Sequence, residues 1–268
     1  MSYKIITLDL DGTLTNSKKE ITPPTKEALI NIQKKGYKVI LASGRPTKGV
    51  LPLALELDLD KYGSYILSFN GGKIINCKTM ETIYQKTLPA NIIPDLYEHA
   101  IAHKVGMITY DDDYIITGTP INKYMEIESK IVGMPIKTVD NFSEYVNFPV
   151  NKCLMSAEPD DLNDIENELK EKYHQYLSIY RSENFFLEIM PKGIDKAHSL
   201  LKLLSSIGIT EKEMICCGDG FNDISMIEVA GLGVAMENAV DVVKEAADYI
   251  TLSNDEDGIL HVINKFML

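Results

Sequence analysis

The sequence predicts an α/β protein in which a parallel-sheet domain is interrupted by an inserted α+β domain. One observation is a pair of almost wholly apolar runs near the N-terminus, at residues 3–8 and 37–43, with a helical segment between them. A second is that the same alternation of apolar strands and helices returns after residue 195. A third is that the intervening strands alternate apolar and polar residues instead. The predicted boundaries are 1–84 and 189–268 for the discontinuous domain, and 85–188 for the inserted one.

The N-terminal segment has the order strand, loop, helix, strand. In "TPPTKEALINIQKKG", Thr22 can cap the start of a helix and Pro23 fits the first helical position. Gly36 ends the helical pattern. The flanking strands carry almost no polar residues, so we expect helices on both faces of their sheet, as in parallel α/β folds.

The C-terminal third continues this order. Apolar strands and amphipathic helices alternate, and the acidic stretch "NDEDG" precedes a last helix. The expected elements are a helix at 195–208, a strand at 213–218, a helix at 222–231, a strand at 232–236, a helix at 239–247 and a strand at 249–252.

The middle of the chain has a different pattern. The stretches "DDD" and "SEN" interrupt alternating strands and predict hairpins. Helical segments "IIPDLYEHAIAHK" and "DDLNDIENELKEKY" lie between them. We therefore expect an antiparallel sheet with helices on one face.

Charge and composition narrow the functional classes. The 268-residue chain carries a formal charge of −12, which argues against non-specific binding to nucleic acid or to an anionic membrane. An anionic substrate remains compatible, because a metal ion can reverse the local charge. No apolar run approaches the ~20 residues that span a bilayer, and the four cysteines lack metal-site spacing. We expect a cytoplasmic protein, and the sequence does not indicate its oligomeric state.

The tetrapeptide "LDLD" occurs twice, in different surroundings. The first copy contains Asp9 and Asp11, closes an apolar strand and is followed by Gly12. Two carboxylates ~4 Å apart repel by ~1 kcal/mol in water and ~4 kcal/mol near a dielectric constant of 20, so a shared cation or a proton is expected. An ordinary polar exit from the strand is the alternative. The second copy, Leu57–Asp60, reads as a helix end with solvated aspartates.

A second acidic loop, "GDGFND", follows the predicted strand at 213–218. It supplies Asp219, Asn222 and Asp223. Parallel strands bring their carboxyl ends to one edge of the sheet, and carboxylate oxygens suit Mg²⁺. A simple turn is the competing interpretation.

Other candidates are single residues. Ser43 and Gly44 follow a strand in "SGR", where a hydroxyl and a close backbone N–H could bind an anion. Lys196 opens a helix whose dipole disfavours a cation there, which suggests a function, although a solvated surface lysine is the alternative. His99 and His103 are four apart but lack a third ligand, so a solvated helix face is favoured. The stretch "NGG" at 70–72 predicts a tight turn.

Four motifs in this order, "DLDGTLT", "ASGRP", "PKGIDKAHSL" and "GDGFNDISM", resemble those of the haloacid dehalogenase (HAD) superfamily. The large insertion and the tail "GVAMENA…AADYITLSNDEDGI" resemble its Cof-like sugar-phosphatase branch. The resemblance implies a Rossmann-like parallel-sheet core with an inserted α+β cap. It also implies Mg²⁺-dependent hydrolysis of small phosphorylated metabolites, sugar phosphates foremost, through an aspartyl-phosphate.

The resemblance assigns roles to individual residues. Asp9 would be the nucleophile, and Asp11 would protonate the leaving alcohol and then activate water. The implied phosphate-binding residues are Leu10, Ser43, Gly44, Lys196 and Asn222. The implied metal ligands are Asp9, Asp11 through its carbonyl, Asp219 and Asp223, the last either directly or in support. Arg45 and Asn70 are expected substrate contacts.

Two other functions remain open from the sequence. A mutase would pass the phosphoryl group to a sugar rather than to water, and the sequence does not separate the two reactions. A non-catalytic phosphometabolite-binding module is the other, but binding alone would not require both Asp9 and Asp11.

Overall fold

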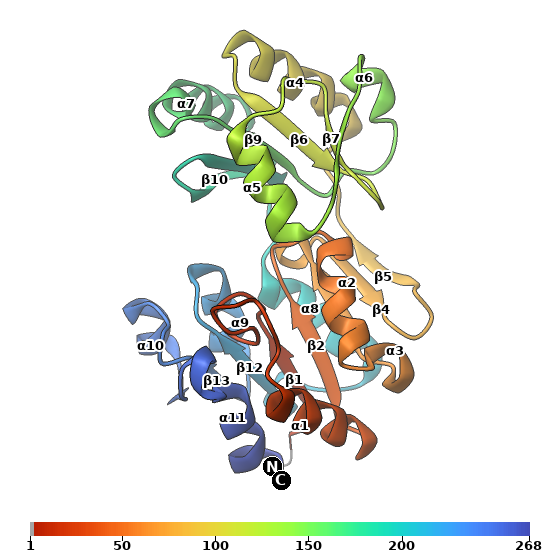
Figure 1. Ribbon diagram of the computed structural model, residues 1–268, viewed down its shortest axis with the longest axis vertical. Coiled ribbons are helices and arrows are strands. Elements are labelled where there is room, and N and C mark those ends of the chain that lie inside the picture. Colours follow the sequence, from red (N-terminus) through yellow and green to blue (C-terminus); the bar gives the residue numbers. More distant parts are fainter. Residues whose placement is uncertain (1–2) are drawn as a thin grey trace. The chain divides into compact units, whose positions relative to one another are not determined.

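The structure of the protein is a computed structural model that describes residues 3–268 (Figure 1). It forms two compact units, one containing the residues up to Tyr84 together with Asp195–Leu268, the other containing Gln85–Ile194. The second boundary lies after Ile194 rather than at residue 188, because a strand of the second unit runs to Pro191. That each unit is a domain in its own right stays a prediction.

The first unit is built on an eight-stranded sheet with the order β14-β13-β12-β1-β2-β3-β4-β5. The strands from β14 to β3 are parallel, and β4 pairs antiparallel with β3. The parallel α/β class is therefore confirmed, with an antiparallel extension that the sequence did not indicate. The strands are β1 (Ile5–Leu8), β2 (Lys38–Ala42), β3 (Tyr65–Ser68), β4 (Lys73–Asn76), β5 (Thr82–Gln85), β12 (Met214–Gly218), β13 (Leu232–Ala235) and β14 (Tyr249–Ile250).

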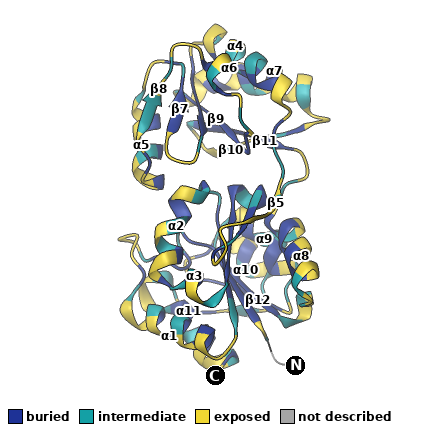
Figure 2. Ribbon diagram, turned by 90° about the vertical axis from the view of Figure 1, so that its right-hand side faces the viewer, coloured by how far each residue is buried: buried dark blue, intermediate teal, exposed yellow. Residues whose placement is uncertain are grey.

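Both faces of this sheet are buried, as Figure 2 shows for its central strands. In β1, Ile6 and Leu8 pack into one hydrophobic cluster and Ile5 into another, and the same alternation recurs in β2 and β12. Helices α1, α2 and α11 contribute to the first cluster and α8 to the second. The helices are α1 (Pro23–Lys34), α2 (Thr47–Glu56), α3 (Leu59–Tyr62), α8 (Lys196–Ile207), α9 (Ile224–Val229), α10 (Asp241–Ala246) and α11 (Gly258–Phe266).

The helix starts differ from the expectation in one detail. Thr22 occupies the N-cap position of α1, but its side chain makes no capping hydrogen bond. Its hydroxyl donates instead to the Asp257 carboxylate, which ties the start of α1 to the segment before α11. At α8 the Asp195 carboxylate accepts from the His198 N–H, and Gly208 ends the helix in the left-handed conformation.

The second unit contains a six-stranded sheet with the order β10-β11-β9-β6-β7-β8. Its pairs are antiparallel except β7–β8, and "DDD" and "SEN" form the hairpins β6–β7 and β10–β11 as predicted. Helices α4 and α7 pack into one hydrophobic cluster with this sheet. The elements are β6 (Gly106–Tyr110), β7 (Ile115–Thr117), β8 (Ile136–Thr138), β9 (Cys153–Ser156), β10 (Leu177–Glu183), β11 (Phe186–Pro191), α4 (Ile93–Ala102), α5 (Lys123–Val132), α6 (Phe142–Tyr145) and α7 (Leu162–Tyr173).

Short 3-10 turns join several of these elements. They are η1 (Phe69–Gly71), η2 (Ala90–Ile92), η3 (Pro159–Asp161), η4 (Glu211–Glu213), η5 (Phe221–Asp223) and η6 (Asn254–Glu256).

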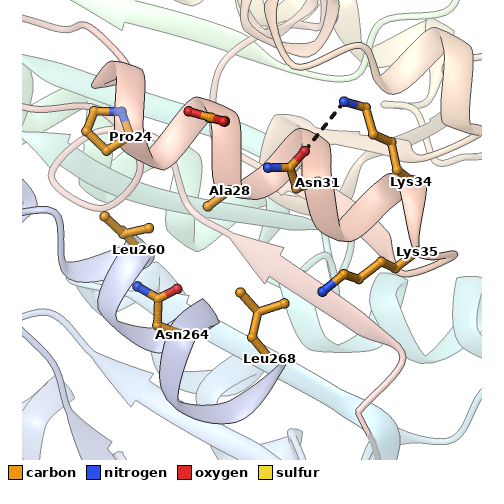
Figure 3. Close-up of a pocket in the computed structure, with 9 residues that line it drawn as sticks. Pro24, Ala28, Asn31, Lys34, Lys35, Leu260, Asn264 and Leu268 are labelled. Carbon is orange, nitrogen blue, oxygen red and sulfur yellow. Dashed lines mark hydrogen bonds between the residues drawn. The ribbon is translucent and has the colours of Figure 1, made fainter.

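A surface pocket lies between α1 and α11 (Figure 3). It is lined by residues such as Ala28, Leu260 and Leu268, and none of the residues expected to carry chemistry borders it. Within residues 3–268, no helix is both long and apolar enough to cross a membrane.

Helix α8 offers a matched pair of leucines for testing the core. Leu203 is fully buried against the sheet, whereas Leu201 is 40% exposed on the same helix. We expect Leu203→Ala to lower the free energy of unfolding by about 2–5 kcal/mol, because a cavity remains where the side chain was. Leu201→Ala should change it by about 0.5 kcal/mol or less. Denaturant unfolding of both variants measures the difference, and similar losses would contradict this packing.

Candidate active site

The predicted site residues of the first unit gather where parallel strands end. β12, β1 and β2 are neighbours in the sheet, so the loops after them leave from the same edge. Asp9 follows β1, Ser43 follows β2 and Asp219 follows β12. The topology thus unites residues that lie far apart in the sequence.

Lys196 lies at the centre of this group. Its ammonium Nζ donates to Asp9 Oδ1 at 2.6 Å and to Asp223 Oδ1 at 2.6 Å. The lysine is completely buried and Asp223 is 1% exposed. The alternative of a solvated surface lysine is therefore wrong. A cation at the first position of α8 is stabilised by two carboxylates that outweigh the opposing helix dipole.

The pKa values of this cluster report crowded carboxylates. Burial, with the nearby charge of Asp223, raises the pKa of Asp9 well above its usual range, although Lys196 opposes the shift. Burial alone would lower the pKa of Lys196, but the charges of Asp223 and Asp9 outweigh it and raise that pKa. Lys196 is consequently a permanent cation in this site.

Asp223 holds the acidic loop in shape. Its Oδ2 accepts hydrogen bonds from the backbone N–H groups of Asp219 and Gly220, at 3.0 and 2.9 Å. Its Oδ1 binds Lys196, so both carboxylate oxygens already have partners. This geometry makes Asp223 the residue that positions Lys196 and the start of the loop.

Asp219 faces the turn after the first "LDLD". Thr13 Oγ1 donates to Asp219 Oδ1 at 2.6 Å. Burial raises the pKa of Asp219 to about 6, the charge of Asp223 adds to this, and the Thr13 hydrogen bond opposes it. Gly12 has a φ of +89°, and a Cβ there would lie 2.3 Å from Asp219 Oδ2. Glycine is therefore required both for the turn and for the approach of Asp219.

Asp11 has different partners from Asp9. The Arg45 guanidinium donates from Nε to Oδ2 at 2.8 Å and from a terminal nitrogen to Oδ1 at 2.6 Å, and Lys19 Nζ donates to Oδ1 at 2.8 Å. Burial alone would raise the pKa of Asp11, but the hydrogen bonds and charge of Arg45, followed by those of Lys19, lower it. The carboxylates that crowd Asp9 are thus Asp223 and Asp219, whereas the expected repulsion between Asp9 and Asp11 is relieved by cations on Asp11.

Asn70, in the turn after β3, links the loop after β2 to the loop after β12. The Asn70 N–H donates to the Ser43 carbonyl at 2.9 Å, and Asn222 Nδ2 donates to Asn70 Oδ1 at 3.0 Å. A Cβ on Gly44 would lie 3.2 Å from Asn70 Oδ1. The predicted turn at "NGG" is present, and Phe69, Asn70 and Gly71 all have positive φ. Two consecutive non-glycine residues in this region indicate strain held by the surroundings.

The second "LDLD" lies at a helix end, as predicted. Leu57 and Leu59 are buried, and Asp58 has a left-handed conformation between α2 and α3. Lys61 Nζ donates to Asp58 Oδ1 at 2.6 Å on the surface. Neither Asp58 nor Asp60 joins the acidic cluster.

Several residues that support the site were not singled out from the sequence. Thr13 and Lys19 belong to the motif turn and the loop after it, but nothing in their spacing names Asp219 or Asp11 as partners. Ser199 Oγ donates to the Gly71 carbonyl at 2.7 Å and fastens α8 to the strained turn. Asn238 Nδ2 donates to the Gly12 carbonyl at 2.8 Å. Thr13, Ser199 and Asn238 lie within the stretches "DLDGTLT", "PKGIDKAHSL" and "GVAMENA" that carry the family resemblance, whereas Lys19 lies outside them.

The acidic cluster fits a divalent cation that prefers oxygen ligands. Carboxylate oxygens of Asp9, Asp219 and Asp223 lie within 4.8 Å of one another. Burial, with the nearby charge of Asp223 in addition, raises the pKa values of Asp9 and Asp219, and a single lysine faces these three carboxylates. A cation would remove that imbalance. The carboxylate of Asp11 is not part of this cluster among the described residues.

Comparison with known proteins assigns the family. The family described as haloacid dehalogenase-like hydrolase matches residues 6–263, which is nearly the whole chain. The chain belongs to this family. A structure of a haloacid dehalogenase-like hydrolase from Bacteroides thetaiotaomicron is 48% identical and has a TM-score of 0.96, with 98% of this chain and 99% of that chain covered.

Two relatives of the HAD family have described activities. The 5-amino-6-(5-phospho-D-ribitylamino)uracil phosphatase YcsE of Bacillus subtilis is 31% identical over 100% of this chain and 97% of its own length. The structure of the HAD subclass IIB sugar phosphatase BT4131 is 27% identical with a TM-score of 0.80, and 98% of each chain is covered. The protein is a HAD-family phosphatase that acts on small phosphorylated substrates.

Two glycines with positive φ test the role of the motif turn. In Gly12→Ala the new methyl group would displace Asp219, whereas a Cβ at Gly36, with a φ of +96°, meets nothing within 4 Å. We expect Gly12→Ala to lower phosphatase kcat/KM by about 100-fold, the size of effect that an ångström-scale misplacement can cause. Gly36→Ala should cost about 1 kcal/mol of stability and leave kcat/KM unchanged. Equal activity in the two variants would show that the Gly12–Asp219 contact is unimportant.

Proposed function

We propose that this HAD-family phosphatase is a Mg²⁺-dependent enzyme that hydrolyses sugar phosphates and related metabolites through an aspartyl-phosphate on Asp9. The observation that carries the proposal is the position of the Lys196 ammonium, 2.6 Å from one oxygen of Asp9. A protein that only bound a phosphorylated metabolite would not need a buried carboxylate that is held by a permanent cation and lies beside two further carboxylates. The arrangement suits a carboxylate that must approach an anionic phosphate.

In the first step Asp9 attacks phosphorus. Lys196 holds Oδ1, so Oδ2 is the oxygen that forms the new P–O bond. The bond from phosphorus to the substrate oxygen breaks, and Asp11 gives a proton to that oxygen. Lys196 balances charge on the nucleophile and on the phosphoryl group, which lowers the barrier to the approach of two anions.

In the second step water attacks the phosphorus of the aspartyl-phosphate. Asp11 removes a proton from that water, the bond to Asp9 breaks, and inorganic phosphate leaves. The contact with Arg45 keeps Asp11 as a carboxylate, which is the form that a base requires. To act as the acid in the first step, Asp11 must instead be protonated, so its carboxyl group must leave Arg45 and contact the substrate. We propose Arg45 as the residue that controls this exchange.

The remaining loops would bind the phosphoryl oxygens and the cation. Bound Mg²⁺ would supply positive charge to the phosphoryl group. We propose Asp9, Asp219 and the Asp11 carbonyl as its ligands, with Asp223 supporting them, since both oxygens of Asp223 already have partners. The proposed phosphate-binding groups are the Leu10 and Gly44 backbone, Ser43, Lys196 and Asn222.

The second unit is proposed to act as a cap that selects the substrate. Sugar phosphates are favoured because the relatives include a sugar phosphatase and a phosphatase of a ribityl phosphate. Asn70 is proposed as a substrate contact, since its side chain meets Asn222 in the strained turn. We also propose that the enzyme works in the cytoplasm, which its four free, buried cysteines support.

Substitution of the two "LDLD" copies tests the nucleophile. Asp9→Asn should lower turnover of an aryl phosphate by at least about 10³-fold, because the amide is a poor nucleophile. Asp58→Asn and Asp60→Asn should retain wild-type turnover, since neither carboxylate joins the cluster. Rapid quenching should trap acid-stable phosphoprotein in the wild type and none in Asp9→Asn. Full activity in Asp9→Asn would reject the covalent mechanism.

Metal dependence can be measured apart from activity. Mg²⁺ added to chelator-treated protein should raise the melting temperature, because it relieves repulsion among Asp9, Asp219 and Asp223. In Asp219→Asn the rise should be much smaller, while the melting temperature without Mg²⁺ should not fall. Asp241→Asn, on the surface of α10, serves as a control and should respond like the wild type. An equal Mg²⁺ response in Asp219→Asn would remove Asp219 from the ligand set.

A further inference from the structure

Helices α4 and α7 of the second unit lie side by side and carry a polar cluster of ligand-type side chains. On α4, Asp95 and His99 are four residues apart, and His103, the C-cap residue of α4, follows four residues later on the same face. On α7, Glu168 and Lys172 are also four apart and face them. Residues 3–268 contain two groups of side chains close enough to hold a metal ion, and this is the one that contains imidazoles.

The donor atoms already have spacings that suit a small cation. His103 Nε2 lies 2.9 Å from Glu168 Oε2, and His99 Nδ1 lies 3.7 Å from the same oxygen. All three ligand atoms lie within 4.8 Å of one another. Tetrahedral zinc with bonds of about 2.0–2.1 Å places its donors about 3.3 Å apart. We propose that His99, His103 and Glu168 form a binding site for a divalent transition metal ion of the zinc class.

The surroundings of His99 match those of a metal-binding histidine. When Nδ1 binds the metal, Nε2 carries the proton and can donate to Asp95 Oδ2 after a small movement, because the two atoms lie 3.6 Å apart in this structure. The Tyr173 hydroxyl and the Lys172 ammonium also donate to the Asp95 carboxylate and hold it in place. A carboxylate behind a ligating imidazole fixes its tautomer and raises its basicity. Asp95 is therefore a positioning residue of this site.

Lys172 does not occupy the metal position. Its Nζ donates a hydrogen bond to His99 Nε2 at 3.3 Å, and this nitrogen is turned toward Asp95 rather than toward Glu168. When the metal binds Nδ1, the imidazole proton moves to Nε2, which loses the hydrogen bond from Lys172 and turns to Asp95. Lys172 keeps its hydrogen bonds of 2.9 and 2.8 Å to the Asp95 carboxylate. The local charge remains favourable, because Asp95 and Glu168 carry two negative charges against one lysine.

The ligand types select the kind of ion. Two imidazoles and one carboxylate suit zinc and neighbouring transition metals, whereas the carboxylate cluster around Asp9 suits Mg²⁺. The side chains of His99 and His103 are 23% and 21% exposed, so an ion can reach them from solvent. Because the ligands come from two helices, the bound ion would link α4 to α7 and stabilise the second unit. Three protein ligands leave a fourth position for water.

Calorimetric titration of Zn²⁺ into the full-length protein, in chelator-treated buffer that contains excess Mg²⁺, tests the proposal. The wild type should bind one more Zn²⁺ than His103→Ala or Glu168→Gln, and Zn²⁺ should raise the melting temperature of the wild type more than that of either variant. Asp95→Asn should retain the site with about 10–100-fold weaker affinity. His174→Ala removes another exposed histidine of the same unit and should bind like the wild type.

Equal Zn²⁺ stoichiometry and affinity in the wild type, His103→Ala and Glu168→Gln would overturn the proposal, and would leave these side chains as a hydrogen-bonded contact between helices. Glu168 is 52% exposed, so Glu168→Gln keeps the test valid if a histidine variant fails to fold. All variants should retain wild-type aryl phosphatase activity with Mg²⁺. The visible spectrum of the Co²⁺-loaded protein provides an independent signal, which His103→Ala should lose.

Discussion

The first unit depends on the burial of one ammonium group between two carboxylates. Lys196 and its partners Asp9 and Asp223 come from the ends of three different elements, so the ion pairs fix those elements with respect to one another. Removing Lys196 would leave the buried carboxylates of Asp9 and Asp223 without their cation, and an uncompensated buried charge typically costs about 3–5 kcal/mol. The same charge that makes Asp9 competent toward phosphate therefore also holds the site together. Structural and chemical requirements converge on a single side chain.

Around that centre, each carboxylate has an environment suited to a separate task. Asp9 and Asp219 are crowded and have raised pKa values, so they favour a cation between them. Asp11 is paired with Arg45 and Lys19 and stays ionised. Both carboxylate oxygens of Asp223 have hydrogen-bond partners, and Oδ2 accepts from two backbone N–H groups of the acidic loop. Four aspartates of identical chemistry are thus differentiated by their neighbours alone.

The sequence could predict the elements whose pattern is local. The apolar runs of β1, β2 and β12 and the glycine after α8 have one physical interpretation, and the structure confirms it. The four-residue strands β3 and β4 were not predicted, although the turn at residues 70–72 between them was. The positive φ of Phe69 and Asn70 in that turn is imposed by the rest of the fold. For the candidate active site, the sequence indicated which residue types take part, but it did not indicate which side chains pair with one another. The pairing of Asp11 with Arg45 and of His103 with Glu168 depends on how distant segments pack.

The order of the strands has a consequence for the newly made chain. β1 lies between β2 and β12, but Ile5 pairs with Met214, about 200 residues later in the sequence. At a synthesis rate of 5–20 residues per second, one edge of β1 stays unpaired for roughly 10–40 s. This edge consists of Ile5–Leu8, which bears no charge to discourage pairing with another strand. Until the C-terminal third emerges from the ribosome, this unpaired strand edge of the nascent chain is exposed. Aggregation of the chain or its binding by a chaperone would therefore take place in this interval.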